Sequence, residues 1–103
     1  MSSHAEGEGT QAIGINSHAE GNGTIALGEN SHTQGRYNIE DAENEYAYIV
    51  GNGELNKRSN AHTLDWSGNA CYAGDIYANG ADKTTGKKVA TEEYVREQII
   101  EEV

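Results

Sequence analysis

The sequence contains no proline and no phenylalanine, and it has a single cysteine and a single tryptophan. One cysteine excludes an intrachain disulfide framework and a metal site built on paired CxxC motifs. Only 35% of the 103 residues are hydrophobic, so a solitary globule of this size has little apolar surface to bury. The composition therefore predicts one small domain at most, or a piece of a longer chain.

Positive charge is also scarce, with 7 Lys and Arg residues against 17 Asp and Glu residues and a formal net charge of -10. Binding to a nucleic-acid backbone or to an anionic membrane surface requires clustered positive charge on the protein. No run approaches the roughly 20 apolar residues that span a bilayer. The N-terminus lacks the basic and then apolar pattern of a signal peptide. We therefore expect no nucleic-acid partner and no membrane insertion.

Glycine is abundant, with 13 residues, and much of it lies in an internal repeat. Residues 3–16 read SHAEGEGTQAIGIN and residues 17–30 read SHAEGNGTIALGEN, so ten of the 14 aligned positions are identical. A third copy opens at Ser31 and loses the pattern near residue 36. A glycine costs about 1 kcal/mol in a helix interior, which argues against a coiled coil. The repeat instead predicts about two and a half β-solenoid coils, each with two short strands and two glycine turns.

The alternation of side chains along each copy divides small residues from large ones. Ala12 and Ala26 fall on one face and are expected to fill a thin interior, whereas Ile13, Ile25 and Leu27 fall on the opposite face. An outward apolar stripe needs another surface to cover it. Two and a half coils are also fewer than the three or so that independent stability requires. Both points predict a homo-oligomer with Ile13, Ile25 and Leu27 at its interface.

Residues 37–90 are expected to form a β-rich region. The run 46–50, YAYIV, is β-branched and aromatic, which is typical of a strand. Residues 61–66 and 70–78 predict two further strands joined by a hairpin turn at 67–69. Residues 79–88 are polar and contain glycine, so we expect a loop there.

Residues 91–103 are the one helix that the sequence predicts. Thr91 is a suitable N-cap. The acidic residues that follow it lie in the first turn, where the positive end of the helix dipole stabilises negative charge. Val95, Ile99 and Val103 recur at four-residue spacing with Ile100 beside them. A helix this short is marginal alone in water, so its apolar stripe is expected to join the chain to its copies.

The repeat SHAEGxGTxAxG resembles the head repeats of trimeric autotransporter adhesins, which also occur in bacteriophage tail and fibre proteins. The later stretches YNIEDAENEYAYIVGNG, RSNAHTLDWSGNA, YAGDIYANG and GKKVATEEYV look like C-terminal portions of phage or prophage tail, baseplate and host-recognition proteins. The resemblance implies a mainly β fold: a short left-handed parallel β-roll over 1–36, a small β-rich region over 37–90 and a trimerising helix over 91–103. It further implies an intertwined homotrimer. Cys71 departs from the pattern, since an aromatic residue is expected there.

This resemblance implies a structural and adhesive segment of a phage or prophage tail appendage. The expected partners are two further copies of the chain, other tail or baseplate proteins and a host-surface glycan. The expected location is the virion or the extracellular space, after synthesis in the bacterial cytoplasm. Two alternatives remain open, namely the head of a bacterial trimeric surface adhesin and a fragment of a glycan-degrading tail spike.

The histidines His4, His18 and His32 recur every 14 residues and are expected to form a ladder. A ladder facing a threefold axis is a candidate metal or anion site, but half-exposed turn histidines that hydrogen-bond between coils explain the pattern better. Cys71 is expected to be a small buried strand residue. No group of residues indicates catalysis, a cofactor or a metal, so the sequence predicts a protein that is not an enzyme.

Two further patterns receive weaker interpretations. Acidic residues at 40–45 are interpreted as a solvated turn in preference to a calcium loop, and Asp65 and Asp75 as surface carboxylates in preference to a glycosidase pair. Trp66 and the central tyrosines are expected mainly to build the core in the absence of phenylalanine. Trp66 and Tyr72 are also candidate glycan contacts.

Overall fold

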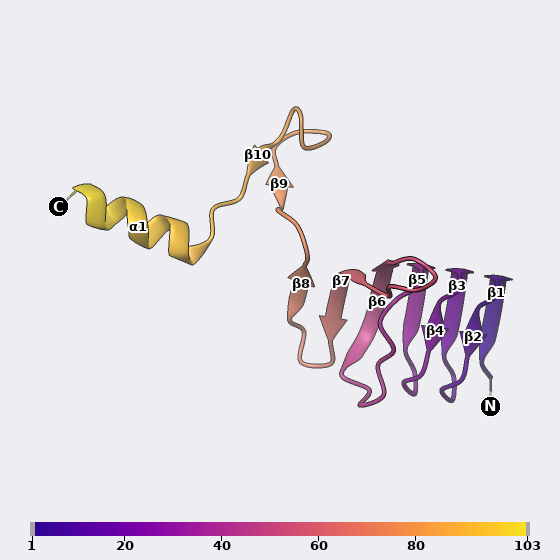
Figure 1. The fold of residues 1–103 in the computed structure, drawn as a ribbon. Coiled ribbons are helices and arrows are strands. Elements are labelled where there is room, and N and C mark those ends of the chain that lie inside the picture. The colour runs from indigo at the N-terminus through magenta and orange to yellow at the C-terminus, as the bar shows by residue number, and fades with distance from the viewer. Residues whose placement is uncertain (1, 103) are drawn as a thin grey trace. The chain divides into compact units, whose positions relative to one another are not determined.

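The computed structural model describes residues 2–102, which form ten strands and one helix (Figure 1). The chain divides into two compact units between Ala73 and Gly74, and each is described by itself. The boundary expected at residue 36 falls inside the first unit. The mainly β character predicted from the sequence is confirmed.

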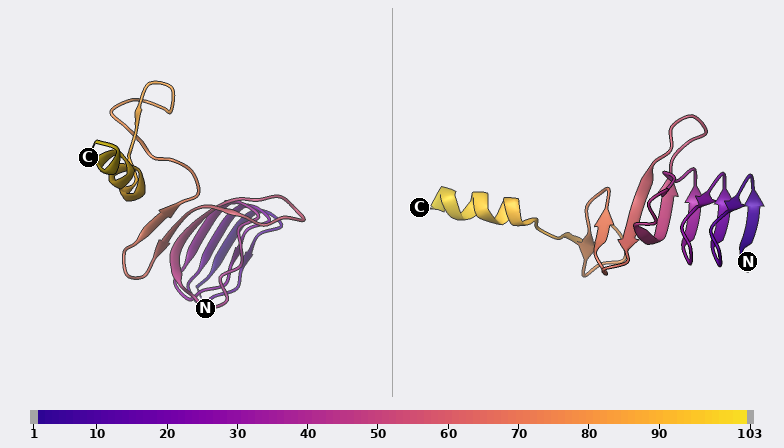
Figure 2. Two further views of the ribbon diagram at one scale, coloured as in Figure 1. Left: turned by 60° about the vertical axis from the view of Figure 1, so that its left-hand side comes forward. Right: turned by 90° about the horizontal axis from the view of Figure 1, so that it is seen from below.

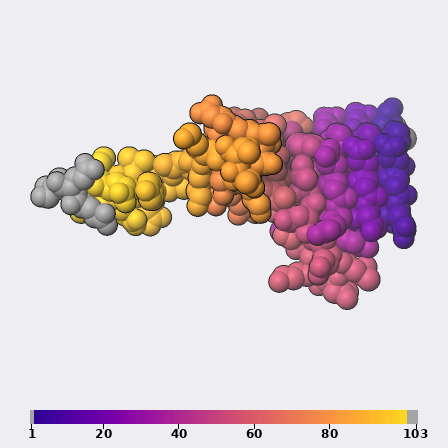
Figure 3. All heavy atoms as spheres, turned by 90° about the horizontal axis from the view of Figure 1, so that it is seen from above, coloured from indigo at the N-terminus to yellow at the C-terminus, as the bar shows by residue number. Residues whose placement is uncertain are grey.

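The first unit is a stack of coils. Strands β1 (His4–Glu8), β3 (His18–Asn22) and β5 (His32–Arg36) lie parallel in one sheet, and β2 (Gln11–Ala12) and β4 (Ile25–Ala26) pair in parallel as a second, narrower sheet. Residues one repeat apart lie side by side, for example His4 beside His18 and His18 beside His32. Successive stretches of sequence therefore form successive layers (Figures 2 and 3), as the repeat predicts for a β-solenoid.

The stack continues past the point where the repeat fades. Strand β6 (Tyr46–Asn52) pairs parallel to β5, with Thr33 beside Ile49. The sheet then ends in two antiparallel strands, β7 (Asn60–Asp65) and β8 (Ala70–Tyr72), in the order β1-β3-β5-β6-β7-β8. The predicted strand at 46–50 and the hairpin about 67–69 are confirmed, although the second hairpin strand is shorter than expected. The prediction that the stack ends near residue 36 is wrong, because β6 adds a further parallel strand to it.

The interior of the first unit is thin and is filled by one row of aligned side chains. Ala19, Thr33 and Ile49 are almost completely buried and occupy the same row in neighbouring strands. The opposite wall contributes Ala26, which is fully buried as predicted. A coil of 14 residues encloses so little space that small and β-branched side chains fill it, and none of the aromatic residues that the structure describes is buried there.

Ile25 departs from the sequence prediction. Its side chain is only 5% exposed within a single chain, so the expectation that Ile25 needs another chain to cover it is wrong. Asn38, itself fully buried, accepts a hydrogen bond from the Ile25 N–H at 2.8 Å and donates one to the Ile25 carbonyl at 3.0 Å. The Asn38 side chain thereby takes the place of a further strand beside β4, and the segment around it lies against Ile25.

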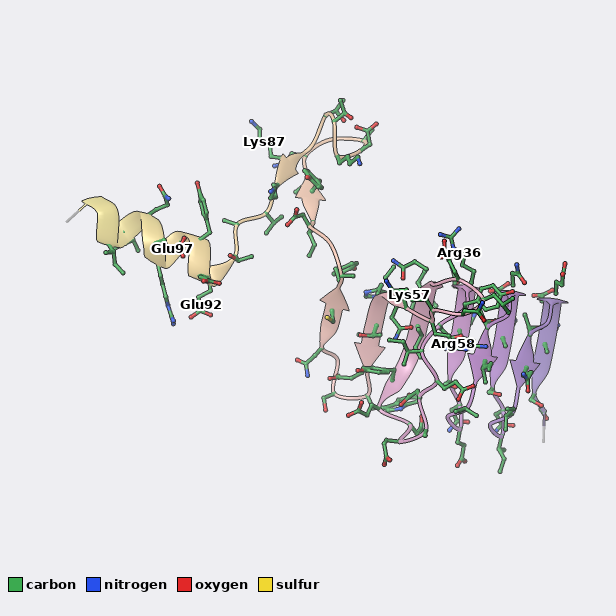
Figure 4. The ribbon with its side chains drawn as sticks, viewed as in Figure 1. Arg36, Lys57, Arg58, Lys87, Glu92 and Glu97 are labelled. Carbon is green, nitrogen blue, oxygen red and sulfur yellow. The ribbon has the colours of Figure 1, made fainter. Side chains whose placement is uncertain are left out.

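Arg58 holds this arrangement from the loop between β6 and β7. Its Nη1 donates to the carbonyl oxygens of Gly23 at 2.9 Å and Asn38 at 3.1 Å. The guanidinium also lies 5.6 Å from the centre of the Tyr37 ring, within the range of a cation–π contact. Arg36 and Lys57 lie at the same end of the strands as Arg58 (Figure 4).

A glycine ladder fixes how closely the coils approach. Gly7, Gly21 and Gly35 all have positive φ, at 104°, 106° and 94°. A Cβ atom at these positions would lie 2.1, 2.0 and 2.3 Å from the carbonyl oxygen of the glycine in the next layer, the last being Gly51. Both the backbone conformation and the contact therefore exclude a side chain along this line of the stack.

The second unit begins with a short hairpin formed by β9 (Tyr77–Ala78) and β10 (Lys87–Lys88). The sequence predicts only a loop at 79–88, so β10 is an addition. Asp82 organises the hairpin loop by accepting hydrogen bonds from the backbone N–H groups of Thr84 and Thr85. These bonds, led by the one from Thr85, hold the pKa of Asp82 below its ordinary value.

Helix α1 (Glu92–Glu102) confirms the predicted C-terminal helix. The Thr91 hydroxyl accepts a hydrogen bond from the Tyr94 N–H at 3.1 Å, which is the predicted N-cap. Val95 and Ile99 are exposed within a single chain, as is Ile100. Val103 lies outside the described residues. Within the described part of the chain, no helix is long and apolar enough to cross a bilayer.

The glycine ladder predicts an ordered set of stability losses on substitution by alanine. Gly21→Ala combines an unfavourable φ with a collision against Gly35, so we expect a loss of roughly 2–5 kcal/mol in the free energy of unfolding. Gly68 has a φ of 92° but open space around it, so Gly68→Ala should cost only the backbone term, about 1–2 kcal/mol. Chemical denaturation of the variants measures both losses.

Gly74→Ala is the matched control for this series. Gly74 has neither a positive φ nor a neighbour within reach of a Cβ, so this variant should change stability by about 1 kcal/mol or less. Equal losses for Gly21→Ala and Gly68→Ala would show that the contact between layers does not limit the packing.

Candidate functional site

A row of aromatic rings runs along the outer face of the six-stranded sheet. The imidazoles of His4 and His18 are stacked with centroids 4.7 Å apart, and those of His18 and His32 with centroids 4.5 Å apart. The histidine ladder predicted from the 14-residue spacing is therefore confirmed. It arises because identical residues occupy the same position in successive parallel strands.

The ring ladder extends beyond the repeat. Tyr48 meets His32 edge-on at 5.5 Å, His62 meets Tyr48 at 5.9 Å, and Tyr72 stacks on His62 at 4.3 Å. Sequence reasoning missed this extension because the pairing shifts at β6, where residue 48 lies beside residue 32, and because β7 and β8 reverse direction. Tyr72, a candidate glycan contact, is thus one member of this row.

Carboxylates lie beside two of the imidazoles. Glu20 Oε1 is 2.9 Å from His32 Nε2, and Glu6 Oε1 is 3.4 Å from His18 Nε2. The hydrogen bond with His32 is the main cause that holds the pKa of Glu20 below its ordinary value, and the charges of His18 and His32 act in the same direction. The hydrogen bond between His32 and Glu20 joins one coil to the next, as the sequence predicts for the histidines. His18 Nε2 is buried and makes no hydrogen bond among the described residues, so its contact with Glu6 is only a close approach. The histidines also lie in strands and not at the turns where the sequence placed them.

His18, Glu20 and His32 also form the one group of potential metal ligands among the described residues, with ligand atoms within 4.8 Å of one another. A zinc ion lies about 2.0–2.1 Å from a ligating imidazole nitrogen and in the plane of its ring. The rings of His18 and His32 are only 20° from parallel and 4.5 Å apart. Both cannot direct a lone pair at one ion without unstacking, so the geometry favours the structural interpretation.

The aspartates at 41, 65 and 75 each have local partners. Asp41 accepts hydrogen bonds from the N–H groups of Glu45 and Tyr46. Asp65 accepts bonds from the Asn69 side chain and from the backbone N–H groups of Ser67 and Asn69, and the Asn69 contacts are the main cause of its lowered pKa. Asp75 contacts Lys88 at 3.5 Å. Asp65 and Asp75 belong to different units, and each serves its own turn or hairpin.

Cys71 and Trp66 differ from the expectations for them. Cys71 is exposed, so the prediction of a buried thiol is wrong, because β8 is the edge strand of the six-stranded sheet that the structure describes. Trp66 is 51% exposed, and Tyr72 and Tyr77 are also exposed. The prediction that these aromatic residues mainly build the core is therefore wrong for them. Trp66 follows the end of β7, in the turn that leads to β8.

An asparagine ladder runs along successive turns of the stack and ends at Trp66. Sequence reasoning did not identify it. Asn16, Asn30 and Asn44 all adopt a left-handed φ, at 59°, 64° and 52°, which asparagine tolerates better than most residues. Asn16 Nδ2 donates to Asn30 Oδ1 at 3.3 Å, and Trp66 Nε1 donates to Asn44 Oδ1 at 3.2 Å. The signal for this ladder was the 14-residue spacing, which Asn44 keeps although its coil has otherwise lost the repeat.

A shallow pocket of about 340 Å³ lies at the end of this ladder, lined by Glu29, Asn30, Asn44 and Trp66. Gly28 allows it to form, because a Cβ there would lie 2.1 Å from Asn44 Oδ1. A second pocket of about 420 Å³ lies within the other unit, lined by Asp75, Lys88, Val89, Ala90, Thr91 and Tyr94. The first pocket combines an exposed indole and amides with a carboxylate that has no partner among the described residues.

The residues expected at a trimer interface differ in exposure. Ile13 is 58% exposed and Leu27 is half-buried, whereas Ile25 is covered by its own chain. Ile15, which the sequence did not place at the interface, is exposed as well. Val95 and Ile99 are exposed on α1. An apolar surface open to solvent is thus present on each unit.

The lowered pKa of Glu20 predicts a pH-dependent effect of Glu20→Gln. Because the pKa in the folded state lies below the ordinary value of 4.5, the carboxylate stabilises the fold above that value and loses this effect as the pH falls through the folded pKa. The variant should therefore be less stable than the parent at about pH 6, and this difference should shrink as the pH is lowered to about 3. Thermal melting across this range measures the difference.

Glu8→Gln is the control, because within the described residues Glu8 makes no side-chain hydrogen bond or ion pair. It should change stability little at either pH. A loss for Glu20→Gln that is the same at both pH values would contradict an electrostatic role for Glu20.

Stacking of the imidazoles predicts weak zinc binding. Calorimetric titration of tag-free protein with Zn²⁺ should show no tight stoichiometric site, because coordination has to disrupt the ladder. The His18→Ala variant serves as the reference. Sub-micromolar binding in the parent that is lost in this variant would contradict the prediction and establish a metal site.

Comparisons with known proteins do not assign a function to these residues. The sequence matches no protein-family model, no curated protein and no solved structure. A function for the chain is therefore inferred from its repeat, its fold and its exposed surfaces.

Proposed function

We propose that the chain is a structural and adhesive segment of a phage or prophage tail appendage and acts as a homotrimer. The observation that carries the proposal is the exposed aliphatic surface on a β-solenoid built from adhesin-like repeats. Ile13 and Ile15 are exposed on the solenoid, and Val95, Ile99 and Ile100 are exposed on α1. Apolar surface in such amounts marks sites of association.

The helix supports assembly independently of the solenoid. An isolated helix of 11 residues is marginal in water, and Ile99 is 58% exposed within one chain. Three parallel copies would bury Val95 and Ile99 against their own counterparts, as in a short coiled coil. Full burial of one such side chain contributes about 1.5–3 kcal/mol, which is offset in part by the entropy of ordering.

The other parts of the proposal follow from this assembly. A stack of coils that is followed along the chain by an oligomerising helix suits a component that joins other tail or baseplate proteins and presents its surface to a host glycan. Its place is then the virion or the outside of the cell. The local bonding of Asp41 and Asp65 supports a binding role in preference to hydrolysis.

Light scattering coupled to size exclusion tests the assembly. The chain should elute with about three chain masses at micromolar concentration. Ile13→Asp should weaken the trimer, because it would bring carboxylates together in an apolar contact. Removal of residues 91–103 should lower the melting temperature and make it more dependent on protein concentration.

Leu55→Asp is the matched control, since Leu55 is also highly exposed but lies in the loop between β6 and β7. It should leave the mass unchanged. A monomer mass for the parent chain would refute the assembly. Baseplate, holin or endolysin genes beside the coding sequence would support the tail setting, whereas a membrane-anchor domain downstream would favour a bacterial surface adhesin.

A further inference from the structure

We infer that the pocket formed by Trp66, Asn44, Asn30 and Glu29 is a binding site for a neutral pyranose. The inference rests on the adhesive part of the proposed function and assigns that function to one place on the chain. Small-ligand sites typically combine an apolar wall with a few convergent polar groups. This pocket combines one indole ring with two amides and a carboxylate.

Trp66 supplies a rigid aromatic wall. Its indole Nε1 donates to Asn44 Oδ1 at 3.2 Å, and its backbone N–H donates to the Glu45 carbonyl at 3.3 Å. The side chain nevertheless remains 51% exposed. The face of an aromatic ring is electron-rich, so it attracts the polarised C–H groups on the flat side of a sugar ring. A ring that is already fixed loses little conformational entropy when a ligand stacks on it.

Glu29 and Asn30 supply the polar contacts. Within the part of the chain that the structure describes, the Glu29 carboxylate makes no hydrogen bond or ion pair, and Asn30 Nδ2 donates no hydrogen bond. A carboxylate accepts from two neighbouring hydroxyl groups, and an amide N–H donates to a third oxygen. These groups therefore match adjacent hydroxyls of a pyranose that stacks on Trp66.

The turn conformation holds both residues at the pocket. Asn30 has a left-handed φ of 64° and accepts a hydrogen bond from Asn16, while Asn44 Nδ2 donates to the Glu29 carbonyl at 3.4 Å. Adjacent turns of the stack thus position the Asn30 side chain and the backbone of Glu29 before any ligand binds. Such preorganisation improves affinity by reducing the cost of ordering.

Charge selects the class of sugar. Glu29 places a negative charge in the pocket, and the chain carries a formal net charge of -10. The cationic residues of the first unit, namely Arg36, Lys57 and Arg58, lie at the opposite end of the strands from the turn that carries Trp66 (Figure 4). Among the described residues, no cation lines the pocket. Sialic acids and uronic acids are therefore disfavoured, and neutral or N-acetylated hexoses are favoured.

Trp66 is the chain's single tryptophan, so intrinsic tryptophan fluorescence reports on this pocket alone. The full-length chain would be titrated separately with N-acetylglucosamine, methyl α-galactoside, methyl α-mannoside and N-acetylneuraminic acid. At least one neutral sugar should give a saturable change in emission with a Kd of the order of 1 mM, typical of weak single-sugar contacts. The anionic sugar should give none.

Variants then assign the site. Glu29→Gln should weaken binding of the neutral sugar by roughly tenfold, the equivalent of one strong hydrogen bond. Trp66→Ala, followed by NMR of the sugar, should abolish binding. Leu55→Ala is the control, because Leu55 is also exposed but lies in the loop between β6 and β7 and does not line the pocket, and it should bind as the parent does.

Three results would overturn the inference: no saturable signal with any neutral sugar up to about 100 times the expected Kd, unchanged binding in both Glu29→Gln and Trp66→Ala, or equal affinity for N-acetylneuraminic acid. Melting curves confirm that the variants fold. A trimer that binds no sugar would refute the site and leave the assembly standing. A monomer that binds sugar would refute the assembly and leave the site standing.

Discussion

The close approach of backbone to backbone along the glycine ladder is the constraint on which the first unit depends. Each ladder glycine faces the carbonyl oxygen of the next at a distance that leaves no room for a Cβ. This contact sets the register of β1, β3 and β5, and the register in turn aligns every other row of side chains. The buried row of Ala19, Thr33 and Ile49, the stacked imidazoles and the asparagine turns are all consequences of it.

The alignment of identical side chains in successive layers has an energetic cost, which neighbouring side chains of opposite charge offset. Stacked histidines and stacked carboxylates repel when they carry the same charge. In this chain Glu6 lies beside His18 and Glu20 beside His32, so each of these two imidazoles has a carboxylate of the preceding layer beside it. The asparagine ladder avoids the problem altogether, because an amide carries both a donor and an acceptor and can bond to its own kind.

The sequence predicted the parts of the fold that repeat and missed the parts that do not. Identity at 14-residue spacing was enough to place His4, His18 and His32 in one row and to predict the stacked strands. Ile25 was misplaced because its cover comes from the segment around Asn38, which has no counterpart in the repeat. Alternation along a strand tells which side a residue faces, but not whether a distant loop lies over that side.

The same limit explains the aromatic residues and the pocket. A core without phenylalanine suggested that Trp66 would be buried, yet a coil lined by alanine and threonine has no volume for an indole. The pocket depends on three turns that approach one another only through the stack, and on the absence of a side chain at Gly28. Asn44 was visible in the sequence at the repeat spacing, but its partner Trp66 lies outside any repeat, so their hydrogen bond had no signal.

The equivalence of the layers means that the first unit is extensible. The glycine contact and the stacked imidazoles between β1 and β3 recur between β3 and β5, so one more copy of the 14-residue sequence can enter the stack without requiring a new kind of contact. Each such insertion would lengthen the stack by about 4.8 Å, the spacing of neighbouring strands. The capping by Asn38 and Arg58 and the Trp66 turn would be carried along unchanged. Duplication of a short stretch of gene could thus adjust the reach of the protein while it preserved the end that carries the aromatic pocket.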